Sequence, residues 1–438
     1  DLTYQRGNEF GLNASVNFDI GNPLIPIHYK EYKEKPKDRL NPLEARITTA
    51  LTSLGFSNIG VLLSGDELQV QADNDKYFYS TKAVGIILST VNEIAPSTVR
   101  KFHIIITEIG IPLFEFSALR EDLIDLYADK LTVSEFSYLS KIRTDVTEAF
   151  DIPIKDRKFF NYGWKPSFQS FLNDPSGFFK YRLGIIVYGI YHPWRGGSLI
   201  ASLEGYPLNT VSTSNEPLSI PVRTDFVPYL QQDVSLGRLM FEQIGKQADN
   251  LYWLLAAGYL ETQYAGLNGQ IATPLKDGRL LVGLSGSAVK KRAVNNPFML
   301  KEDDVKDYYY TGFLDVRLNL PKQELSLDVK AGRFLAGDKG VRVTVSKFIK
   351  GVTVYAWYTW TDTSVFSDSF NSGYHDKGIG VTIPMRLFEG TDSKTTFDYA
   401  ITPWTRDVGV DIYHYDTLFN FIGRNTKVYL DKDGKMLH

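Results

Sequence analysis

The sequence predicts a mainly β fold, a transmembrane antiparallel β-barrel of about fourteen strands preceded by a small α/β domain. Three observations lead to this fold class. Apolar and polar residues alternate over long segments from Arg157 onward. Tyr and Phe number 26 and 27 among 438 residues, an abundance typical of barrels with aromatic girdles. No apolar run reaches the roughly 18–20 residues of a membrane helix, so only strands would cross a membrane.

Composition excludes several classes of function. Lys and Arg total 48 against 51 Asp and Glu, a net charge of -3, which leaves no electrostatic case for binding nucleic acid. Cysteine is absent from the sequence, which excludes disulfides, thiolate metal sites and a cysteine nucleophile. The histidines are scattered over the chain and suggest neither a zinc site nor a catalytic triad. We therefore expect no metal and no cofactor.

Residues 1–22 contain the segment Phe10–Ile20, in which every second residue is apolar. This pattern predicts one strand. A lone strand has nothing to pair with, so we expect it to complete an upstream barrel or a sheet of another chain. The chain starts at Asp1 without a basic and apolar leader, which favours a mature or shortened product. Residues 23–40 are rich in Pro, Lys and Glu and predict an exposed linker.

Residues 41–150 predict a small α/β domain. Apolar spacing marks a helix at Asn41–Leu54, with Asn41 as N-cap and Gly55 as C-cap, and a second helix at Thr81–Ile94. The order αββαββ predicts two layers, with helices on one face of a small sheet, and Ala118–Tyr127 is expected to add a third helix. The predicted hairpins pair Val61–Leu63 with Leu68–Ala72, and Phe102–Thr107 with Leu113–Phe116.

Residues 157–415 carry the alternation predicted for the barrel. In Leu325–Arg333 and Gly340–Lys347, which are joined by the turn Phe334–Lys339, each strand has one apolar and one charged face. Phe179–Tyr191 keeps one apolar face over about twelve residues, the length of a tilted membrane strand. The pattern recurs at Leu314–Leu320, Val352–Trp360, Ile379–Met385 and Val408–Ile412. A membrane barrel requires Ile185, Val343 and Val381 to face outward and Arg342 and Thr382 to face inward.

Connections between the predicted strands alternate between short and long. The short ones include Leu275–Gly278, Pro321–Gln323 and Ile349–Gly351, and the long ones are Pro207–Gln231, Arg292–Asp307 and Thr363–His375. Outer-membrane barrels have short periplasmic turns and long external loops. We therefore expect both ends of the barrel, the α/β domain and a tail of residues 416–438 on the periplasmic side.

Five motifs occur in order along Gly177–Asp411. They are Pro221–Asp225 with Tyr229, Ala257–Glu261 with Tyr264–Gly266, Ala331–Gly340, His375–Ile379 and Pro403–Asp407. In these stretches the chain resembles the YjbH/GfcD family of bacterial outer-membrane proteins of exopolysaccharide and group 4 capsule production. The resemblance implies an outer-membrane location and a polysaccharide as partner. Members of that family are longer at the N-terminus, which implies an upstream barrel segment.

The polar faces of the predicted strands are expected to line the barrel lumen. A functional interpretation makes the lumen a polar conduit or binding surface for a sugar polymer, with Tyr355 and Trp357 as stacking faces. The alternative, which we favour, is a lumen of mutually paired charges that braces or plugs the barrel. The lumen candidates are Asp315, Arg317, Glu324, Asp328, Lys330, Arg342, Tyr355, Trp357, Asp398 and Asp411.

The residues of the family motifs are expected to be structural. Gly337–Gly340 is a Gly-rich turn, but a phosphate loop requires a following helix, and a valine-alternating strand follows here. Glycosidase chemistry needs two carboxylates about 5–10 Å apart, and nothing in the spacing pairs Glu261 with Asp338 or Asp376. The motif residues are Gly258, Glu261, Gly332, Arg333, Gly337, Asp338, Lys339, Gly340, Asp376, Lys377, Gly378, Arg406 and Asp407.

Three functional hypotheses follow. The first is a non-enzymatic outer-membrane barrel in exopolysaccharide or capsule export or assembly, in contact with the polymer, the bilayer and periplasmic export partners. The resemblance alone supplies the polymer. The second is an outer-membrane enzyme that modifies the polymer, which variants at Glu261, Asp338, Asp376 and Asp407 would distinguish from the first. The third is a soluble secreted β-rich protein, which would need no detergent.

Overall fold

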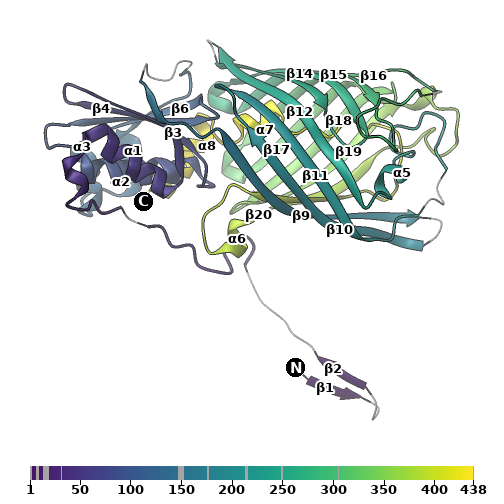
Figure 1. Cartoon of the computed structure of the whole chain (residues 1–438), viewed down its shortest axis with the longest axis horizontal. Coiled ribbons are helices and arrows are strands. Elements are labelled where there is room, and N and C mark those ends of the chain that lie inside the picture. The colour runs from purple at the N-terminus through teal and green to yellow at the C-terminus, as the bar shows by residue number, and fades with distance from the viewer. Residues whose placement is uncertain are drawn as a thin grey trace.

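The computed structural model describes residues 2–5, 9–12, 19–30, 32–146, 152–174, 177–212, 216–247, 250–303 and 305–437. An α/β domain lies at one end of a large β-barrel (Figure 1). We call that end of the barrel the domain end and the opposite one the far end. Across the described ranges, no helix combines the length and apolar character needed to cross a membrane.

The α/β domain consists of a mixed sheet with helices packed on it (Figure 1). Among the described residues the sheet has six strands in the order β7-β6-β5-β4-β3-β8, and only β4 and β5 run parallel. The elements are α1 (Leu43–Leu54), β3 (Phe56–Ser64), β4 (Glu67–Asn74), α2 (Ser80–Ile94), β5 (Lys101–Glu108), β6 (Ile111–Leu119), α3 (Arg120–Tyr127), α4 (Val133–Leu139), β7 (Lys141–Arg143) and β8 (Ile154–Asp156). The predicted order αββαββ and the third helix are confirmed.

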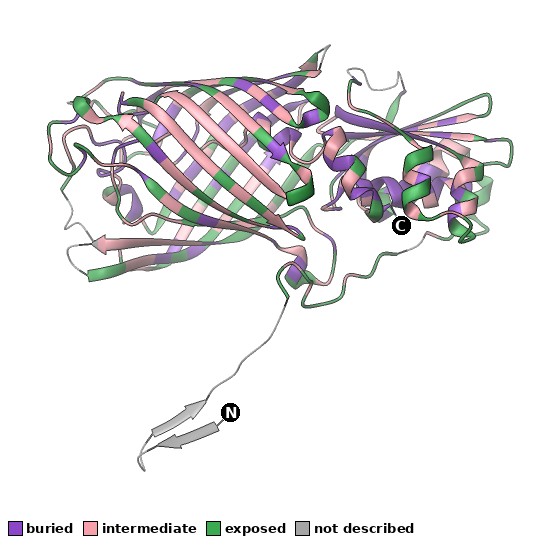
Figure 2. Ribbon diagram, turned by 180° about the vertical axis from the view of Figure 1, so that it is seen from behind, coloured by how far each residue is buried: buried purple, intermediate pink, exposed green. Residues whose placement is uncertain are grey.

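Local sequence explains where α1 begins and ends. Gly55 ends the helix in the left-handed conformation, with φ of 97°, which costs glycine little because it has no Cβ. The N-cap is Pro42 and lacks a side-chain cap, so the predicted capping role of Asn41 is wrong. Ile47, Leu51 and Ile87 are fully buried between α1, α2 and the sheet. Figure 2 shows the same sheet as mostly buried.

The barrel wall is one continuous antiparallel sheet. The described residues form thirteen strands that pair in chain order from β9 to β21. The strands are β9 (Phe160–Asp174), β10 (Gly177–Tyr191), β11 (Gly197–Asn209), β12 (Val234–Gln247), β13 (Leu251–Tyr259), β14 (Tyr264–Leu275), β15 (Leu280–Lys291), β16 (Tyr309–Leu320), β17 (Leu325–Arg333), β18 (Lys339–Ile349), β19 (Val352–Asp362), β20 (Lys377–Pro384) and β21 (Thr396–Ile401). The predicted fold class is therefore confirmed.

The register puts apolar side chains outside and charged ones inside. Val329 pairs with Val343 across β17 and β18, and Lys330 pairs with Arg342 in the next position. Because side chains alternate along a strand, these two rows face opposite sides of the wall. Ile185 is 48% exposed on the outer surface. Arg342 instead points into the lumen, where it donates to the Gly409 carbonyl. The predicted orientation of the alternation is confirmed.

The wall has thirteen described strands rather than the expected fourteen, and it closes without a backbone ladder. Because the thirteen strands alternate in direction, the first and the last of them, β9 and β21, run parallel to each other. Side chains join them instead. Ser170 and Tyr399 share a hydrogen bond of 2.6 Å, Phe168 packs on Tyr399 with ring centroids 5.6 Å apart, and Asn173 donates to the Pro403 carbonyl. We call this contact the seam.

The strand predicted at Val408–Ile412 is wrong. These residues form no strand, and Val408 and Ile412 are buried. The chain turns back after β21 and runs through the barrel to α7 (Leu418–Ile422) and α8 (Lys427–Asp433), which Figure 1 shows in yellow at the domain end. The alternation arises here because one set of side chains packs against the inner wall while its neighbours make hydrogen bonds.

The segment predicted as one strand at Phe10–Ile20 falls only in part within the described residues. Its first residues belong to β2 (Glu9–Leu12), which pairs with β1 (Leu2–Gln5) in an antiparallel hairpin. A partner within the chain therefore exists for β2, whereas we expected none. Residues 13–18 lie outside the described residues. The predicted completion of an upstream barrel stays a prediction.

The α/β domain is attached to the domain end by several direct contacts. Gly196 in the β10–β11 turn donates to the Ile109 carbonyl at 2.9 Å. Lys394, just before β21, pairs with Glu108. Phe78 stacks on Phe348 of β18 with ring centroids 6.5 Å apart. Strand ends, connecting turns and the domain thus form one packed junction.

Candidate functional site

The candidate site is the barrel lumen together with the chain that fills it. We call residues 402–422 the plug. It enters the lumen at the far end, directly after β21, and leaves it at the domain end with α7. Its contacts follow the inner wall in the same order, from the loops of the far end to Gln270 in β14 and Arg317 in β16. The lumen of this barrel is therefore occupied by its own chain.

Asp407 fixes the plug at the far end. Its Oδ1 accepts the backbone N–H groups of Val222, Arg223 and Thr224 at 2.8 to 3.0 Å. Oδ2 accepts the Thr224 hydroxyl at 2.8 Å and the Asn371 amide at 3.2 Å. The side chain is fully buried. A carboxylate that is saturated in this way ties the plug to two loops at once and has no lone pair left for a substrate.

The loop between β17 and β18 holds the next part of the plug. Asp338 accepts the Gly409 N–H at 2.8 Å, and Leu335 donates to the Val410 carbonyl at 2.8 Å. Phe334, Leu335 and Ala336 are buried, and the strand β18 follows. Burial raises the pKa of Asp338 to about 6. The Gly-rich motif is therefore a loop folded into the barrel mouth.

Arg223 and Glu261 form a buried ion pair against the plug. Arg223 donates to both Glu261 carboxylate oxygens, at 2.6 and 3.2 Å, and to the Asp411 carbonyl at 2.9 Å. Glu261 also accepts the Tyr413 N–H at 2.7 Å. Each side chain of the pair is 6% exposed. Because both charges are desolvated, the loss of either partner would leave an uncompensated charge.

Two further wall charges contact the plug from the inner face of β17 and β18. Lys330 donates to Asp411 at 2.7 Å. Arg342 donates to Asp376 at 2.8 Å and to the Gly409 carbonyl at 2.7 Å. Trp357 donates its indole N–H to the same Asp376 at 2.8 Å. Lys330 is thus paired with a plug carboxylate, whereas Arg342 is paired with a carboxylate next to β20 and reaches the plug through a backbone carbonyl.

A cavity of about 420 Å³ remains between the wall and the plug. We call it the lumen cavity. Its charged wall residues are Asp315, Arg317, Asp328, Lys330 and Arg342, and the plug contributes His414, Thr417, Leu418, Phe419 and Asn420. Arg317 and Asp328 pair across β16 and β17 at 2.5 Å. The cavity presents hydrogen-bond donors and acceptors on both sides.

Most of the predicted lumen residues meet in this region, with three differences. Glu324 lies outside the lumen, in the turn between β16 and β17, where it pairs with Arg424 at 3.0 Å and Lys432 at 2.6 Å. Asp411 is in the lumen but belongs to the plug. Tyr355 and Trp357 stack on the inner face with centroids 6.0 Å apart, away from the lumen cavity, and Tyr355 donates to Asp398 at 3.1 Å.

The glycines of the motifs mark close approaches between neighbouring strands. A Cβ on Gly332 would lie 2.0 Å from the Gly312 carbonyl oxygen, and one on Gly340 would lie 1.9 Å from that of Trp360. A Cβ on Gly378 would meet the Trp357 ring at 2.3 Å, and Gly258 adopts φ of 127°. Gly337 also has a positive φ, of 104°. Side chains at these positions would distort the wall.

The remaining charged motif residues, including Arg406 of the plug itself, lie near the far end. Arg406 lies over the rings of Phe370 and Trp404, 5.3 and 5.2 Å from their centroids. Lys377 lies 5.1 Å from the centroid of Tyr374. Arg333 and Lys339, which flank the β17–β18 loop, are exposed. These side chains are therefore not part of the lumen cavity.

Several important residues escaped sequence reasoning. Gln270 accepts the Leu418 N–H at 2.9 Å and so holds α7, and His414 lies 3.5 Å from Asp411. Arg182 is buried on the inner face with its guanidinium 3.7 Å from the Tyr206 ring centroid. Their phase in the strand alternation marks Gln270 and Arg182 as inward-facing, but nothing in the sequence marks their partners. Among the described residues, no group of His, Asp and Glu has the arrangement of a metal site.

Comparison with known proteins agrees with the motif resemblance. A family model named YjbH, described as an exopolysaccharide biosynthesis protein, matches residues 1–424. The chain is also similar to the "uncharacterized lipoprotein YjbH" of Escherichia coli strain K12, with 23% identity over 430 residues. This match covers 93% of the chain and 60% of that protein. The chain thus spans less than two thirds of the relative's length.

Proposed function

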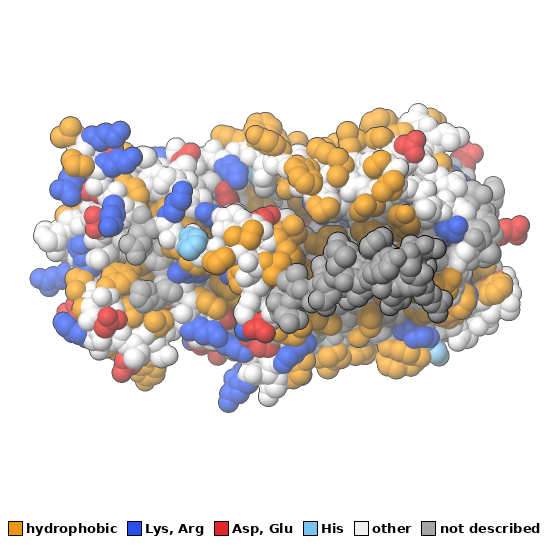
Figure 3. Space-filling model, turned by 90° about the horizontal axis from the view of Figure 1, so that it is seen from below, with side chains coloured by type: hydrophobic (Ala, Val, Ile, Leu, Met, Phe, Trp, Pro, Cys, Tyr) orange, Lys and Arg blue, Asp and Glu red, His pale blue; other side chains and the backbone are white. Residues whose placement is uncertain are grey.

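Because the chain belongs to the YjbH family of exopolysaccharide biosynthesis proteins, we propose that it is a non-enzymatic outer-membrane β-barrel that takes part in polymer export or assembly. The polymer is an exopolysaccharide or a capsule polysaccharide. The observation that carries the proposal is a barrel with an apolar outer surface and a charged, hydrogen-bonded lumen. Figure 3 shows hydrophobic side chains gathered over the barrel strands.

The outer surface supports a membrane location. Ile185, Leu255, Leu284 and Val345 lie on four different strands and are 48 to 58% exposed. Monomeric soluble proteins rarely expose apolar patches of such extent, whereas outer-membrane barrels carry an apolar band about 25 Å tall. Burying this band in lipid would remove the cost of its hydration.

The distribution of connections supports an orientation with the α/β domain in the periplasm. Short turns occur at the domain end, such as η3 (Lys276–Gly278) and η4 (Pro321–Gln323). The far end carries the longer connections 210–233, 292–308 and 363–376. Outer-membrane barrels have short turns on the periplasmic side. In this orientation the domain meets periplasmic export partners and the plug starts from the cell exterior.

The state of the four candidate carboxylates supports a role other than catalysis. Asp407, Glu261, Asp338 and Asp376 all accept hydrogen bonds from the plug, from loops or from wall side chains. Each of them is less than 10% exposed. A general acid or nucleophile has to reach its substrate. We therefore assign Asp407, Glu261 and Asp338 to holding the plug, and Asp376 to orienting Arg342, which contacts the plug.

We propose that the polymer contacts the lumen, including the wall charges of the lumen cavity and the stacked pair Tyr355 and Trp357. Paired charges offer both donors and acceptors to sugar hydroxyls. The relative from Escherichia coli is longer than this chain, so an additional barrel segment is a further proposed partner. The bilayer is the third partner of the proposal.

Genetic complementation tests the proposed function. A strain that lacks the gene is expected to secrete less polysaccharide, and the wild-type gene is expected to restore secretion. Four variants distinguish an enzyme from the proposed non-enzymatic barrel: Glu261→Gln, Asp338→Asn, Asp376→Asn and Asp407→Asn. Release of reducing ends from purified polymer by the wild-type protein, lost in a folded variant, would contradict a non-enzymatic role. Protein recovered in the soluble fraction without detergent would contradict the membrane location.

A further inference from the structure

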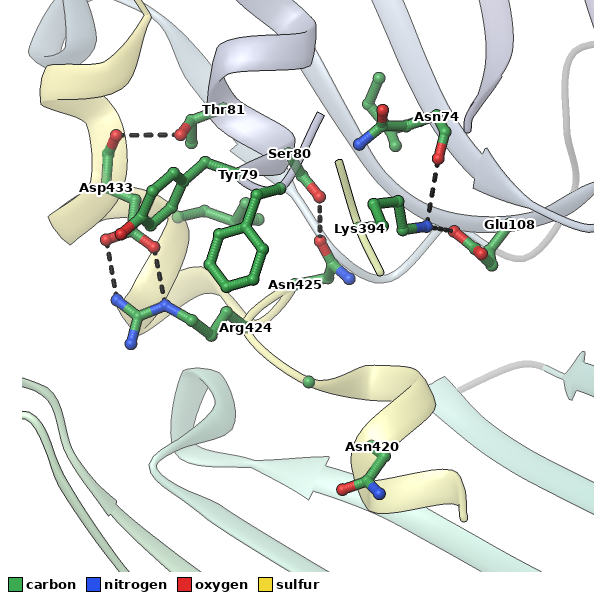
Figure 4. Close-up of a pocket in the computed structure, with 14 residues that line it drawn as sticks. Asn74, Tyr79, Ser80, Thr81, Glu108, Lys394, Asn420, Arg424, Asn425 and Asp433 are labelled. Carbon is green, nitrogen blue, oxygen red and sulfur yellow. Dashed lines mark hydrogen bonds and ion pairs between the residues drawn. The ribbon is translucent and has the colours of Figure 1, made fainter. Parts of the chain in front are cut away.

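A second cavity, of about 270 Å³, lies where the α/β domain, the barrel and the C-terminal segment meet. We call it the junction pocket (Figure 4). Asn74, Tyr79 and Glu108 of the α/β domain line it, together with Lys394 from the barrel and Arg424 from the segment after α7. Asn420 on α7 lines both the junction pocket and the lumen cavity. The two cavities therefore lie on either side of α7.

The partition between the cavities is short and held by few polar contacts. The helix α7 has five residues. Gln270 accepts the Leu418 N–H at 2.9 Å, and Arg317 donates to the Phe419 carbonyl at 3.2 Å. The other contacts are apolar, such as the Phe421 ring 6.2 Å from that of Tyr252. By contrast, the far end of the plug is fixed by the buried carboxylates Asp407 and Glu261.

The tail beyond α7 is fixed to the α/β domain rather than to the barrel wall alone. Ser80 donates to the Asn425 side chain at 2.7 Å, and Thr81 donates to the Asp433 carbonyl at 2.9 Å. Arg424 pairs with Asp433 at 2.8 Å (Figure 4). A movement of the domain relative to the barrel would therefore act directly on α7.

The charged groups of the two cavities are internally paired. Lys394 pairs with Glu108 and Arg424 with Asp433 around the junction pocket. Around the lumen cavity, the lysine and arginine side chains that line it pair with Asp328, Asp315, Asp411 and Asp376. Each of the described cations lining the cavities thus has a carboxylate partner. An anionic ligand would have to compete with these carboxylates, whereas hydroxyl groups are able to bond to both members of a pair.

We propose that the junction pocket and the lumen cavity are consecutive subsites for a neutral stretch of polysaccharide, and that α7 is the partition that moves when the chain passes. The proposal rests on the proposed function and specifies its ligand and its route. The lumen cavity is within the range of about 300–1,000 Å³ typical of ligand sites, and the junction pocket lies just below it. Tyr79 lines the junction pocket and Phe419 lines the lumen cavity, so each subsite has an aromatic side chain.

Conductance across planar bilayers tests the partition. The wild-type protein is expected to be mostly closed. The double variant Gln270→Ala, Arg317→Ala removes the polar contacts of α7 and is expected to open frequently. Retention of the heat-modifiable gel shift would show that the barrel is folded. A folded double variant with wild-type conductance would overturn the role of α7.

Block of the open variant tests the ligand class. Maltohexaose, a neutral probe, is expected to lower its conductance at a concentration about tenfold below that needed for hexagalacturonate, because the acidic probe has to compete with the cavity carboxylates for the cations that they already pair with. The variant Asn420→Trp in the same background fills the space shared by both cavities and is expected to abolish the block. Stronger block by hexagalacturonate than by maltohexaose would overturn the preference for a neutral stretch.

Complementation distinguishes this inference from the proposed function. Asn420→Trp is expected to abolish restored secretion of polysaccharide, while Asn295→Trp, on an exposed loop of the far end, is expected to restore it as the wild type does. If the wild type itself restores no secretion, the proposed function fails. If both tryptophan variants restore secretion, the route through α7 fails and the proposed function stands.

Discussion

The carboxylate of Asp338, in the loop between β17 and β18, accepts the backbone N–H of Gly409 in the plug at 2.8 Å. The two residues lie 71 positions apart in the chain. The contact joins a motif for which the sequence predicts a turn to a segment for which it predicts a strand. Its consequence is that the barrel mouth and the plug are one structural unit.

The raised pKa of Asp338 makes the stability of this unit depend on pH. Its pKa is about 6 in the folded protein against 3.9 for an ordinary Asp. Stability from this group is therefore present below about pH 4 and is lost as pH rises through 6, by about 3 kcal/mol in total. We expect the free energy of unfolding in urea to fall over this range in the wild type relative to Asp338→Asn. Parallel pH profiles of the two proteins would contradict the assignment.

The buried pair of Arg223 and Glu261 is expected to be strongly coupled. Glu261→Gln and Arg223→Met each leave one desolvated charge and should cost about 3–5 kcal/mol in the free energy of unfolding. The double variant should cost clearly less than the sum of the two. The exposed pair Lys130 and Asp125, with side chains 67% and 41% exposed, is the control and should show a coupling of about 0.5 kcal/mol or less. Equal coupling for both pairs would refute the importance of burial.

Two neighbouring residues of β18 test which face of the wall contacts lipid. Val345 is 48% exposed on the outer surface, and Thr344 lines the lumen cavity. In a bilayer, Val345→Arg should cost about 2–4 kcal/mol in folding free energy, because arginine on the lipid face loses its hydration. Thr344→Arg stays hydrated and should cost less. Refolding into lipid vesicles measures both variants, and the reverse order would contradict the membrane barrel.

The seam between β9 and β21 is expected to depend mainly on Tyr399, which makes two of the three contacts described there. Tyr399→Phe removes the hydrogen bond to Ser170 and should cost about 1 kcal/mol. Tyr399→Ala also removes the packing on Phe168 and should cost about 3 kcal/mol. Tyr162→Ala provides a control, because Tyr162 on β9 is 83% exposed and should change stability by about 0.5 kcal/mol or less. Urea unfolding in detergent measures the series. A similar loss in all three variants would argue against a specific seam.

Strand alternation and cap residues predict much of this fold from the sequence. The bounds of β17 agree with the prediction, Leu325–Arg333, because its apolar and charged faces are unambiguous. Gly55 ends α1 as predicted, because the left-handed conformation favours glycine. The candidate site was predictable only in part. Inward phase marks Lys330 and Arg342 as lumen residues, but the partners of these residues lie on the plug.

The sequence by itself determined the barrel architecture, the α/β domain and the outward and inward faces of the wall, because these depend on periodicity and on local backbone preferences. Tertiary structure alone decided that Val408–Ile412 fills the lumen instead of adding a strand. Alternation records only that one set of side chains is buried and the other is hydrogen-bonded, and both conditions hold inside the barrel as well as in its wall. It also decided that Asp338 holds the plug and that Asp407 ties the plug to the loop at Val222–Thr224, because hydrogen bonds between segments so distant in the chain leave no local pattern.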